Sequence, residues 1–228
     1  MSGQPDTVGE QRPLFEWDWV GRNMDRIGER VVEHLELTGV AVASGVLIAL
    51  ALAMVSLRWR RLHAVILGIG GVLYAIPALA AFAFLVPIFG LSFPTAVIPL
   101  ISYTILILVR NIVTGIDQVP GDVREAARGM GFTRARVFRK VELPLAVPVI
   151  VAGTRISAVT TIGLVTVTSI LGVGGLGAFI LQGFRTLPIY PTPIVVGVVA
   201  SVLLAILVDL ALLLTERALT PWARRGSA

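Results

Sequence analysis

Long uncharged runs alternate with short charged segments along this chain. Residues 38–57 contain no charged side chain, and twenty residues rising about 1.5 Å each in an α-helix cross the ~30 Å hydrocarbon core of a bilayer. Residues 64–109 are also uncharged and are long enough for two such helices. Pro87, Gly90 and Pro94 favour a break between these two helices.

The last apolar run, residues 143–215, contains three charged residues, which are Arg155, Arg185 and Asp209. Three prolines between residues 188 and 193 favour another break. The pattern therefore predicts five membrane-spanning helices, near residues 38–57, 65–86, 94–113, 147–170 and 192–214.

Composition supports a membrane protein. Hydrophobic residues make up 56% of the 228 residues and charged residues 14%, whereas about a quarter of a soluble domain is charged. We therefore expect an all-α integral membrane protein. The net charge of +5 is also typical of nucleic-acid binding, but arginines gathered on cytoplasmic loops explain it better, so no nucleic-acid partner is predicted. The chain has no cysteine and two distant histidines, so no metal site is predicted.

The charges also predict the orientation of the spans. Residues 1–37 hold eight acidic residues and four arginines, whereas residues 110–142 hold seven basic and four acidic ones. Cytoplasmic loops of membrane proteins are rich in Lys and Arg. We therefore predict an extracytoplasmic N-terminal segment at 1–37, disordered over 1–14, and a transmembrane domain at 38–215. Its loop 114–146 and the tail 216–228 are predicted to be cytoplasmic.

Two features of the N-terminal part leave alternatives open. Residues 15–36 mix tryptophans and aliphatic residues with charges and are predicted to form an amphipathic helix on the outer membrane surface. Small residues recur every fourth position in the first span, at Ala41, Gly45, Ala49 and Ala53. Such a stripe lets helices approach closely, and packing within the bundle is favoured over a contact between subunits.

The charged loop between the third and fourth spans has the pattern of two short helices. Asp122 is predicted to cap the first helix, with Glu125 closing a capping box. Gly131 supplies the left-handed position that ends this helix, and Thr133 is predicted to cap a second one over 134–141. An ordinary basic loop at the lipid headgroups is the simpler interpretation, but exposed Met130 and Phe132 favour a protein partner.

The spacing of this loop resembles a known signature, EAA-x3-G-x9-[I/V]-x-LP, of the permease subunits of ATP-binding-cassette importers. The resemblance implies a type I importer permease fold and a coupling helix that sits in a cleft of a separate ATPase subunit. The implied coupling residues are Glu125, Ala126, Ala127, Arg128, Met130, Gly131, Phe132, Leu143 and Pro144.

Further segments over about residues 30–215 resemble the osmoprotectant branch of these permeases, which carries glycine betaine, carnitine, choline or proline compounds. They include His34–Thr38, Phe84–Pro87, Arg110–Ile116 and Gly174–Gly177. The resemblance implies a multi-pass protein of the prokaryotic plasma membrane. It also implies a second permease copy, identical or related, and an extracytoplasmic substrate-binding protein. A permease for another small solute such as an amino acid, an ATP-independent channel and a non-transporting scaffold are the alternatives.

Several motifs for other chemistry are absent or misleading. The P-loop pattern needs a lysine after glycine, and the single lysine, Lys140, is followed by Val141. The chain is therefore not expected to be an enzyme, and ATP and Mg²⁺ are expected in the partner ATPase. Residues 172–177 match G-x-G-x-x-G, but a membrane span precedes them instead of a strand of a βαβ unit. A glycine-rich turn at the outer end of the fourth span is favoured.

Hydroxyl groups on the fourth span give a candidate translocation path. Ser157, Thr161 and Thr168 fall on roughly one helix face, and Tyr74 is a further candidate. The alternative is that the hydroxyls bond to carbonyls of their own helix. Arg155 and Asp209 lie at similar depths on antiparallel spans, and because single charges in lipid are costly, they are predicted to pair.

Overall fold

The computed structural model describes residue 13 and residues 15–221, so most of the segment 1–14, for which disorder is predicted, lies outside it. The described residues form helices and no strand. The elements are α1 Trp17–Arg22, α2 Met24–Arg58, α3 Arg60–Ala75, α4 Ala78–Phe89, α5 Phe93–Asp117, α6 Gly121–Gly129, α7 Arg134–Val137, the π-helical η1 Phe138–Glu142, α8 Leu143–Thr168, the 3₁₀ segment η2 Ser169–Leu171, α9 Gly177–Arg185 and α10 Pro191–Leu219.

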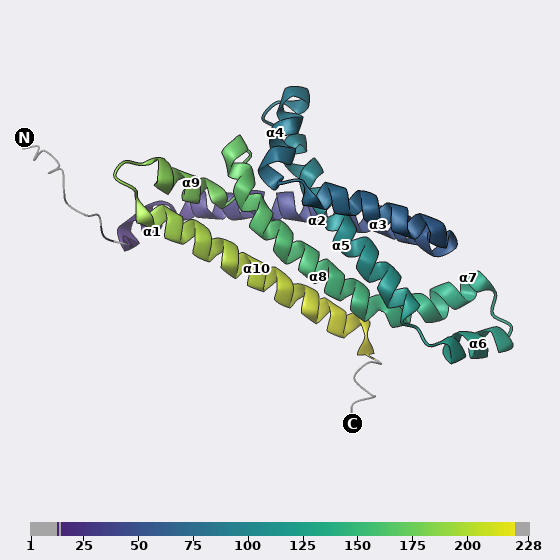
Figure 1. The fold of residues 1–228 in the computed structure, drawn as a ribbon. Helices are drawn as coiled ribbons and strands as arrows, with labels where there is room; N and C mark the ends of the chain where they lie inside the picture. The colour runs from purple at the N-terminus through teal and green to yellow at the C-terminus, as the bar shows by residue number, and fades with distance from the viewer. Residues whose placement is uncertain (1–12, 14, 222–228) are drawn as a thin grey trace, which may run out of the picture.

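Long helices in this structure correspond to the predicted spans. Four stretches are long and apolar enough to cross a membrane, and α3 with α4 makes a fifth when this bent pair is counted as one span. The all-α prediction with about five spans is therefore confirmed. Figure 1 shows α6 and α7 at one end of the bundle, called the loop end below, and α1 and α9 at the other, called the α9 end.

The first span begins earlier than the sequence pattern predicts. Helix α2 starts at Met24 and is 35 residues long, or about 52 Å at 1.5 Å per residue, which exceeds a bilayer core. Residues 24–36 therefore extend the helix of the first span beyond the bilayer core and do not form a separate amphipathic helix. Asn23 divides α1 from α2, and its side chain donates to the Trp19 carbonyl over 2.8 Å.

The small residues of α2 pack within the bundle, as favoured from the sequence. Ala41, Ala49 and Ala53 are fully buried. A Cβ added to Gly45 would lie 1.9 Å from Oγ1 of Thr104 on α5. The two helices therefore approach so closely at this point that no side chain fits between them.

The second span has a bend that the sequence analysis did not predict. Helices α3 and α4 meet at 89°, and Ile76 before Pro77 has an extended ψ of 126°. A residue before proline disfavours helical geometry, which explains the position of the bend. The Tyr103 hydroxyl donates to the Ile76 carbonyl over 2.6 Å, so the carbonyl released from the helix keeps a partner. Pro87, expected to break the chain, lies inside α4.

The predicted short helix at 134–141 is not separate from the fourth span. Residues 134–171 run as one continuous helical stretch, with π geometry at Phe138–Glu142, where the Leu143 amide donates to the Phe138 carbonyl. Pro144 has no amide hydrogen to donate to residue 140, and the wider turn accommodates this gap.

Candidate functional site

Helix α6 is the core of the candidate coupling loop, and its start differs from the prediction. Pro120 occupies the N-cap position, and no side chain caps this end. The predicted capping box is therefore wrong, because Gly121 begins the helix and Asp122 lies within its first turn. A carboxylate in the first turn still interacts favourably with the positive end of the helix dipole.

The end of α6 matches the prediction. Gly131 has a φ of +81°, a conformation that favours glycine. The Phe132 amide donates to the Ala127 carbonyl over 3.1 Å and the Gly131 amide to the Arg128 carbonyl over 2.8 Å, which closes the helix in a Schellman-like turn. Thr133 then caps α7 by accepting a hydrogen bond from the Arg136 amide.

An inward-pointing arginine holds α6 against the spans. Nε of Arg124 lies 2.8 Å from Oε1 of Glu142 on η1, and its guanidinium also donates to the Ile116 carbonyl near the end of α5. Both charged side chains are largely buried. These contacts tie α6 to the end of α5 and to η1, directly before α8.

The outward face of α6 carries a short apolar stripe. Met130 is 70% exposed and Val123 is 37% exposed, and Ala126 between them is also exposed. The sequence analysis missed Val123, although its spacing to Ala126 and Met130 places all three on one helical face. Glu125 and Arg128 are exposed beside the stripe.

The remaining predicted coupling residues have structural surroundings. Ala127 is buried, and Phe132 is half-buried, with the Arg136 guanidinium 5.2 Å from its ring centre. Leu143 and Pro144 are half-buried at the start of α8. These four residues shape the loop, whereas the apolar stripe and its flanking charges are available to a partner.

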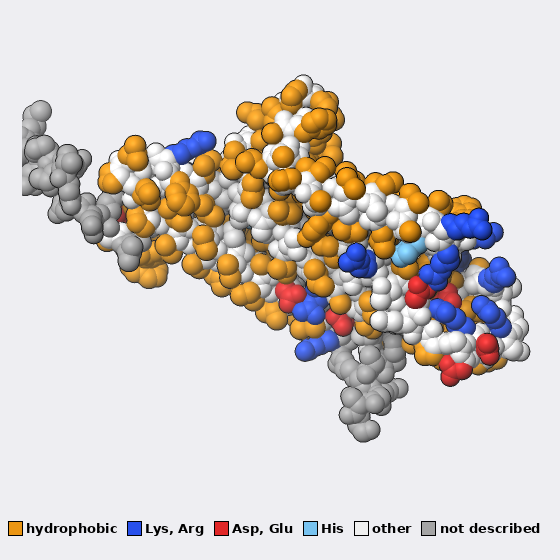
Figure 2. Space-filling view, in the orientation of Figure 1, with side chains coloured by type: hydrophobic (Ala, Val, Ile, Leu, Met, Phe, Trp, Pro, Cys, Tyr) orange, Lys and Arg blue, Asp and Glu red, His pale blue; other side chains and the backbone are white. Residues whose placement is uncertain are grey.

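Positive charge gathers around the loop end (Figure 2). A cavity of about 510 Å³ opens there, and its charged lining residues are Arg58, Arg60, Asp117, Arg124, Arg134, Arg139 and Glu142. Arg60 at the start of α3 forms a hydrogen bond of 2.7 Å with Asp117 at the end of α5. The loop end is thus both basic and internally braced.

Three of the predicted path residues do not reach an open face of this chain. Ser157, Thr161 and Thr168 are buried between helices. Thr161 donates to the Ser157 carbonyl over 2.7 Å and Thr168 to the Val165 carbonyl over 2.8 Å, so these two follow the alternative of bonding to their own helix. Among the predicted path residues, Tyr74 is exposed, at 42%.

The open face of α8 is apolar instead. Ile156 and Val159 are each at least 40% exposed, as is Ile170 in η2 directly after α8. Periodicity placed the hydroxyls correctly on one helix face but did not reveal that neighbouring helices cover this face.

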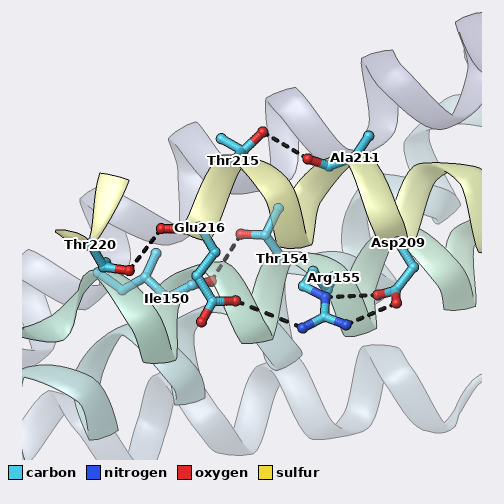
Figure 3. A network of polar contacts seen from close by, with 8 residues as sticks. All are labelled: Ile150, Thr154, Arg155, Asp209, Ala211, Thr215, Glu216 and Thr220. Atoms are coloured by element: carbon cyan, nitrogen blue, oxygen red, sulfur yellow. Dashed lines mark hydrogen bonds and ion pairs between the residues drawn. The ribbon is translucent and has the colours of Figure 1, made fainter. Parts of the chain in front are cut away.

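Arg155 on α8 and Asp209 on α10 lie in direct contact (Figure 3). Nε and Nη2 of Arg155 each donate to one carboxylate oxygen of Asp209 over 2.8 Å. Glu216, two turns further along α10, lies 3.7 Å from the same guanidinium. The bidentate geometry matches the planar fork of arginine to a carboxylate and joins two antiparallel spans.

Comparison with known proteins identifies the family to which this helical chain belongs. Residues 45–221 match the family described as binding-protein-dependent transport system inner membrane component. The chain belongs to this family. As an inner membrane component it is a permease subunit, and its predicted membrane location is confirmed.

Several curated permeases are similar to the chain over most of their length. The choline transport system permease protein OpuBB of Bacillus subtilis (strain 168) is 40% identical over 84% of this chain and 88% of its own. The carnitine transport permease protein OpuCD of Listeria monocytogenes is 35% identical over 90% of this chain and 91% of its own length. The osmoprotectant import permease protein OsmW of Salmonella typhimurium is 33% identical over 87% of this chain and 94% of its own length.

Solved transporters share the fold of this inner membrane component. The MetNI methionine ABC transporter in an inward-facing conformation has a TM-score of 0.76 and 25% identity, covering 87% of this chain and 98% of its own. An amino acid ABC transporter has a TM-score of 0.74 at 20% identity, and the match covers 89% of this chain and 98% of the other. The predicted type I importer permease fold is confirmed.

Proposed function

We propose that this permease is the membrane-spanning subunit of an ATP-driven importer for compatible solutes such as glycine betaine, choline, carnitine or proline. The observation that carries the proposal is the similarity to osmoprotectant permeases, which reaches 40% identity and extends over most of each chain. In the membrane-embedded part of such a protein, substrate contacts and packing are spread over many residues, so similarity over the whole length supports the substrate class better than one motif.

The geometry of α6 supports a coupling step. Its apolar stripe of Val123, Ala126 and Met130 docks into a cleft of a separate ATPase subunit, which binds ATP and Mg²⁺. Closure of the ATPases displaces α6, and the contact of Arg124 with Glu142 and the Ile116 carbonyl passes the displacement to α8 and α5. Two permease copies enclose the path, and an extracytoplasmic binding protein delivers the solute.

The loop end is cytoplasmic in this proposal. It holds the arginine-rich cavity, and basic residues favour the cytoplasmic side. The α9 end then faces outward. Residues 38–215 form the transmembrane domain, 114–146 the cytoplasmic coupling loop and 216–228 the cytoplasmic tail, whereas residues 1–37 belong to the outer side.

Uptake by the reconstituted complex tests the proposal. The permease is incorporated into liposomes with its ATPase and binding protein, and labelled choline, glycine betaine, carnitine and proline are supplied with or without internal ATP. We expect ATP-dependent accumulation of at least one of these solutes. Uptake of none of them, from a complex that hydrolyses ATP, would contradict the proposed substrate class.

An amino-acid importer is the second candidate, because MetNI shares 25% identity and the fold. Labelled methionine, supplied to the same liposomes in parallel with choline and glycine betaine, distinguishes the two. Uptake of methionine without uptake of quaternary ammonium solutes would favour the second candidate.

A further inference from the structure

A buried histidine joins three elements at the α9 end. His34 on α2 is fully buried. Its Nδ1 accepts a hydrogen bond of 3.2 Å from the Leu176 amide, and its Nε2 lies 3.0 Å from the Ile162 carbonyl on α8. Both partners are backbone groups more than 120 residues away in sequence.

These partners define the protonation state of His34. The Leu176 amide is a donor, so Nδ1 must be the unprotonated acceptor nitrogen. Nε2 then carries the hydrogen and donates to the Ile162 carbonyl. The neutral ring satisfies both contacts, whereas a protonated ring would place a second donor opposite the Leu176 amide.

The glycine-rich segment 172–177 is shaped to meet this ring. Gly174 and Gly175 both have a φ of +80°, a region that favours glycine. The Gly175 amide donates over 2.9 Å to Oε2 of Glu33, the residue before His34. A Cβ on Gly174 would lie 2.4 Å from the same Glu33 oxygen, and one on Gly177 would lie 1.9 Å from the Thr166 carbonyl.

This contact lies directly before α9, which begins at Gly177, the residue after Leu176. Leu176 is itself fully buried in an apolar cluster with Trp19, Phe179 and Val196. The ring of His34 and the carboxylate of Glu33 therefore fix the point at which α1, α2, α9 and α10 come together.

We propose that His34 is a positioning residue that holds the 172–177 loop, and with it α9, only while its ring is neutral, so that acid on the α9 side releases the loop. Glu33, His34 and their backbone partners at Gly175, Leu176 and Ile162 are called the His34 clamp. Opening of the clamp allows the ring to take up a proton, and the proton in turn favours the open form.

Few other charges act on the ring. On its own helix Glu33 is paired with Arg30 at 2.8 Å. The loop has no charged residue, α8 has Arg155 seven residues from Ile162, and α9 has Arg185 at its far end. The sequences of α4 and of α5 up to residue 109 hold no charge. Asp25, Glu29 and Glu36 on α2 and Asp18 on α1 are exposed. In the described residues the hydrogen-bond partners of the ring are the Ile162 and Leu176 backbone groups, and Glu33 is the acidic residue tied to the same loop.

Hydrogen exchange of the full-length chain in lipid nanodiscs tests the clamp. Protection of the Leu176 amide, corrected for the pH dependence of chemical exchange, is measured at single-amide resolution from about pH 7.5 to pH 5. We expect it to fall by about tenfold or more, since each unit of pH below the transition shifts a linked equilibrium by about tenfold. The Gly131 amide, bonded to the Arg128 carbonyl at the loop end over 2.8 Å, lies away from the clamp. It serves as the control and should keep its protection.

Substitutions assign the effect to one histidine. His34→Gln supplies one acceptor and one donor without a titrating group, and we expect protection of Leu176 that does not depend on pH. His63→Gln changes the second of the two histidines in the chain and should behave as the wild type. An acid loss that persists in His34→Gln would assign it to Glu33 and overturn the proposal. Unchanged protection of Leu176 in the wild type would overturn it even if His34→Gln does not fold.

The effect of the clamp on transport rests on the proposed function. In liposomes containing the whole importer, solute uptake at acidic external pH should fall several-fold more in the wild type than in His34→Gln. Equal acid loss of uptake in the two proteins would contradict the clamp's role in transport. Absence of uptake at every pH would instead contradict the proposed substrate class, and hydrogen exchange would still decide whether the clamp opens.

Discussion

At the scale of single residues, the coupling loop depends on the left-handed backbone of Gly131. Its φ of +81° costs a residue with a side chain about 1–2 kcal/mol. We expect Gly131→Ala to disturb the turn after α6, to reduce co-purification of the ATPase subunit and to reduce uptake, with normal membrane insertion.

Gly129 provides a matched control, because a Cβ at either glycine meets nothing within 4 Å. Gly129 lies in helical geometry at the end of α6, where alanine is preferred by up to about 1 kcal/mol. Gly129→Ala should therefore keep the ATPase. Equal loss of the ATPase in the two variants would show that the backbone conformation of Gly131 is not the cause.

Residue-scale features were predictable where one residue type has a special backbone property. The role of Gly131 could be predicted because few other residues adopt its conformation. The cap by Asp122 was wrong because the N-cap position falls at Pro120, two residues earlier, and α6 begins at Gly121. Several neighbouring residues are acceptable at such a position. His34 was missed because its partners are backbone groups at Ile162 and Leu176, which no pattern of side chains reveals.

At the scale of helices, the close contact of α2 with α5 makes a sharp prediction. Gly45→Ala would place a Cβ 1.9 Å from the Thr104 hydroxyl oxygen, and overpacking of this kind costs about 1–3 kcal/mol. We expect a lower thermal unfolding midpoint in detergent. Gly39→Ala on the same helix meets nothing within 4 Å and should not lower the midpoint, because alanine is preferred to glycine inside a helix. Thr104→Ala should restore part of the loss caused by Gly45→Ala.

The contact of α8 with α10 makes a second prediction at this scale. Arg155→Gln and Asp209→Asn each leave one charge without its bidentate partner, so each should lower the unfolding midpoint of the detergent-solubilised protein. The double variant should lower it by less than the sum, because neither charge remains. Strictly additive effects would show that the two side chains do not interact. Glu216→Gln, at 3.7 Å from the guanidinium, should have a smaller effect.

The spans themselves were predictable, because long uncharged runs have few alternatives to helices in lipid. The 89° bend at Ile76–Pro77 was not, since no charge interrupts residues 64–109 and several prolines and glycines in that run were equally possible positions for a break. The contact of Arg155 with Asp209 could be predicted from their similar depth in the membrane and their opposite charges. Burial of Ser157, Thr161 and Thr168 could not follow from periodicity, which shows shared faces but not the helix that covers them.

At the scale of the whole molecule, separate polar networks hold the two ends of the bundle. Arg60 with Asp117 and Arg124 with Glu142 brace the loop end, and the His34 clamp holds the α9 end. Helix α2, with 35 residues, is continuous between the two ends (Figure 1). A movement that the proposed coupling starts at α6 therefore has a continuous helical path to the α9 end.

The proposed orientation, with the loop end in the cytoplasm, can be tested directly because the chain has no cysteine. Leu187 after α9 is 86% exposed and Met130 after α6 is 70% exposed, so a cysteine at either position is accessible in the isolated subunit. In intact spheroplasts, a membrane-impermeant maleimide should label Leu187→Cys and not Met130→Cys. After permeabilisation, in cells without the partner ATPase, both should be labelled. Labelling of Met130→Cys alone in intact spheroplasts would reverse the orientation. It would also place α6 on the side opposite to ATP, and the proposed coupling to a cytoplasmic ATPase would then be wrong.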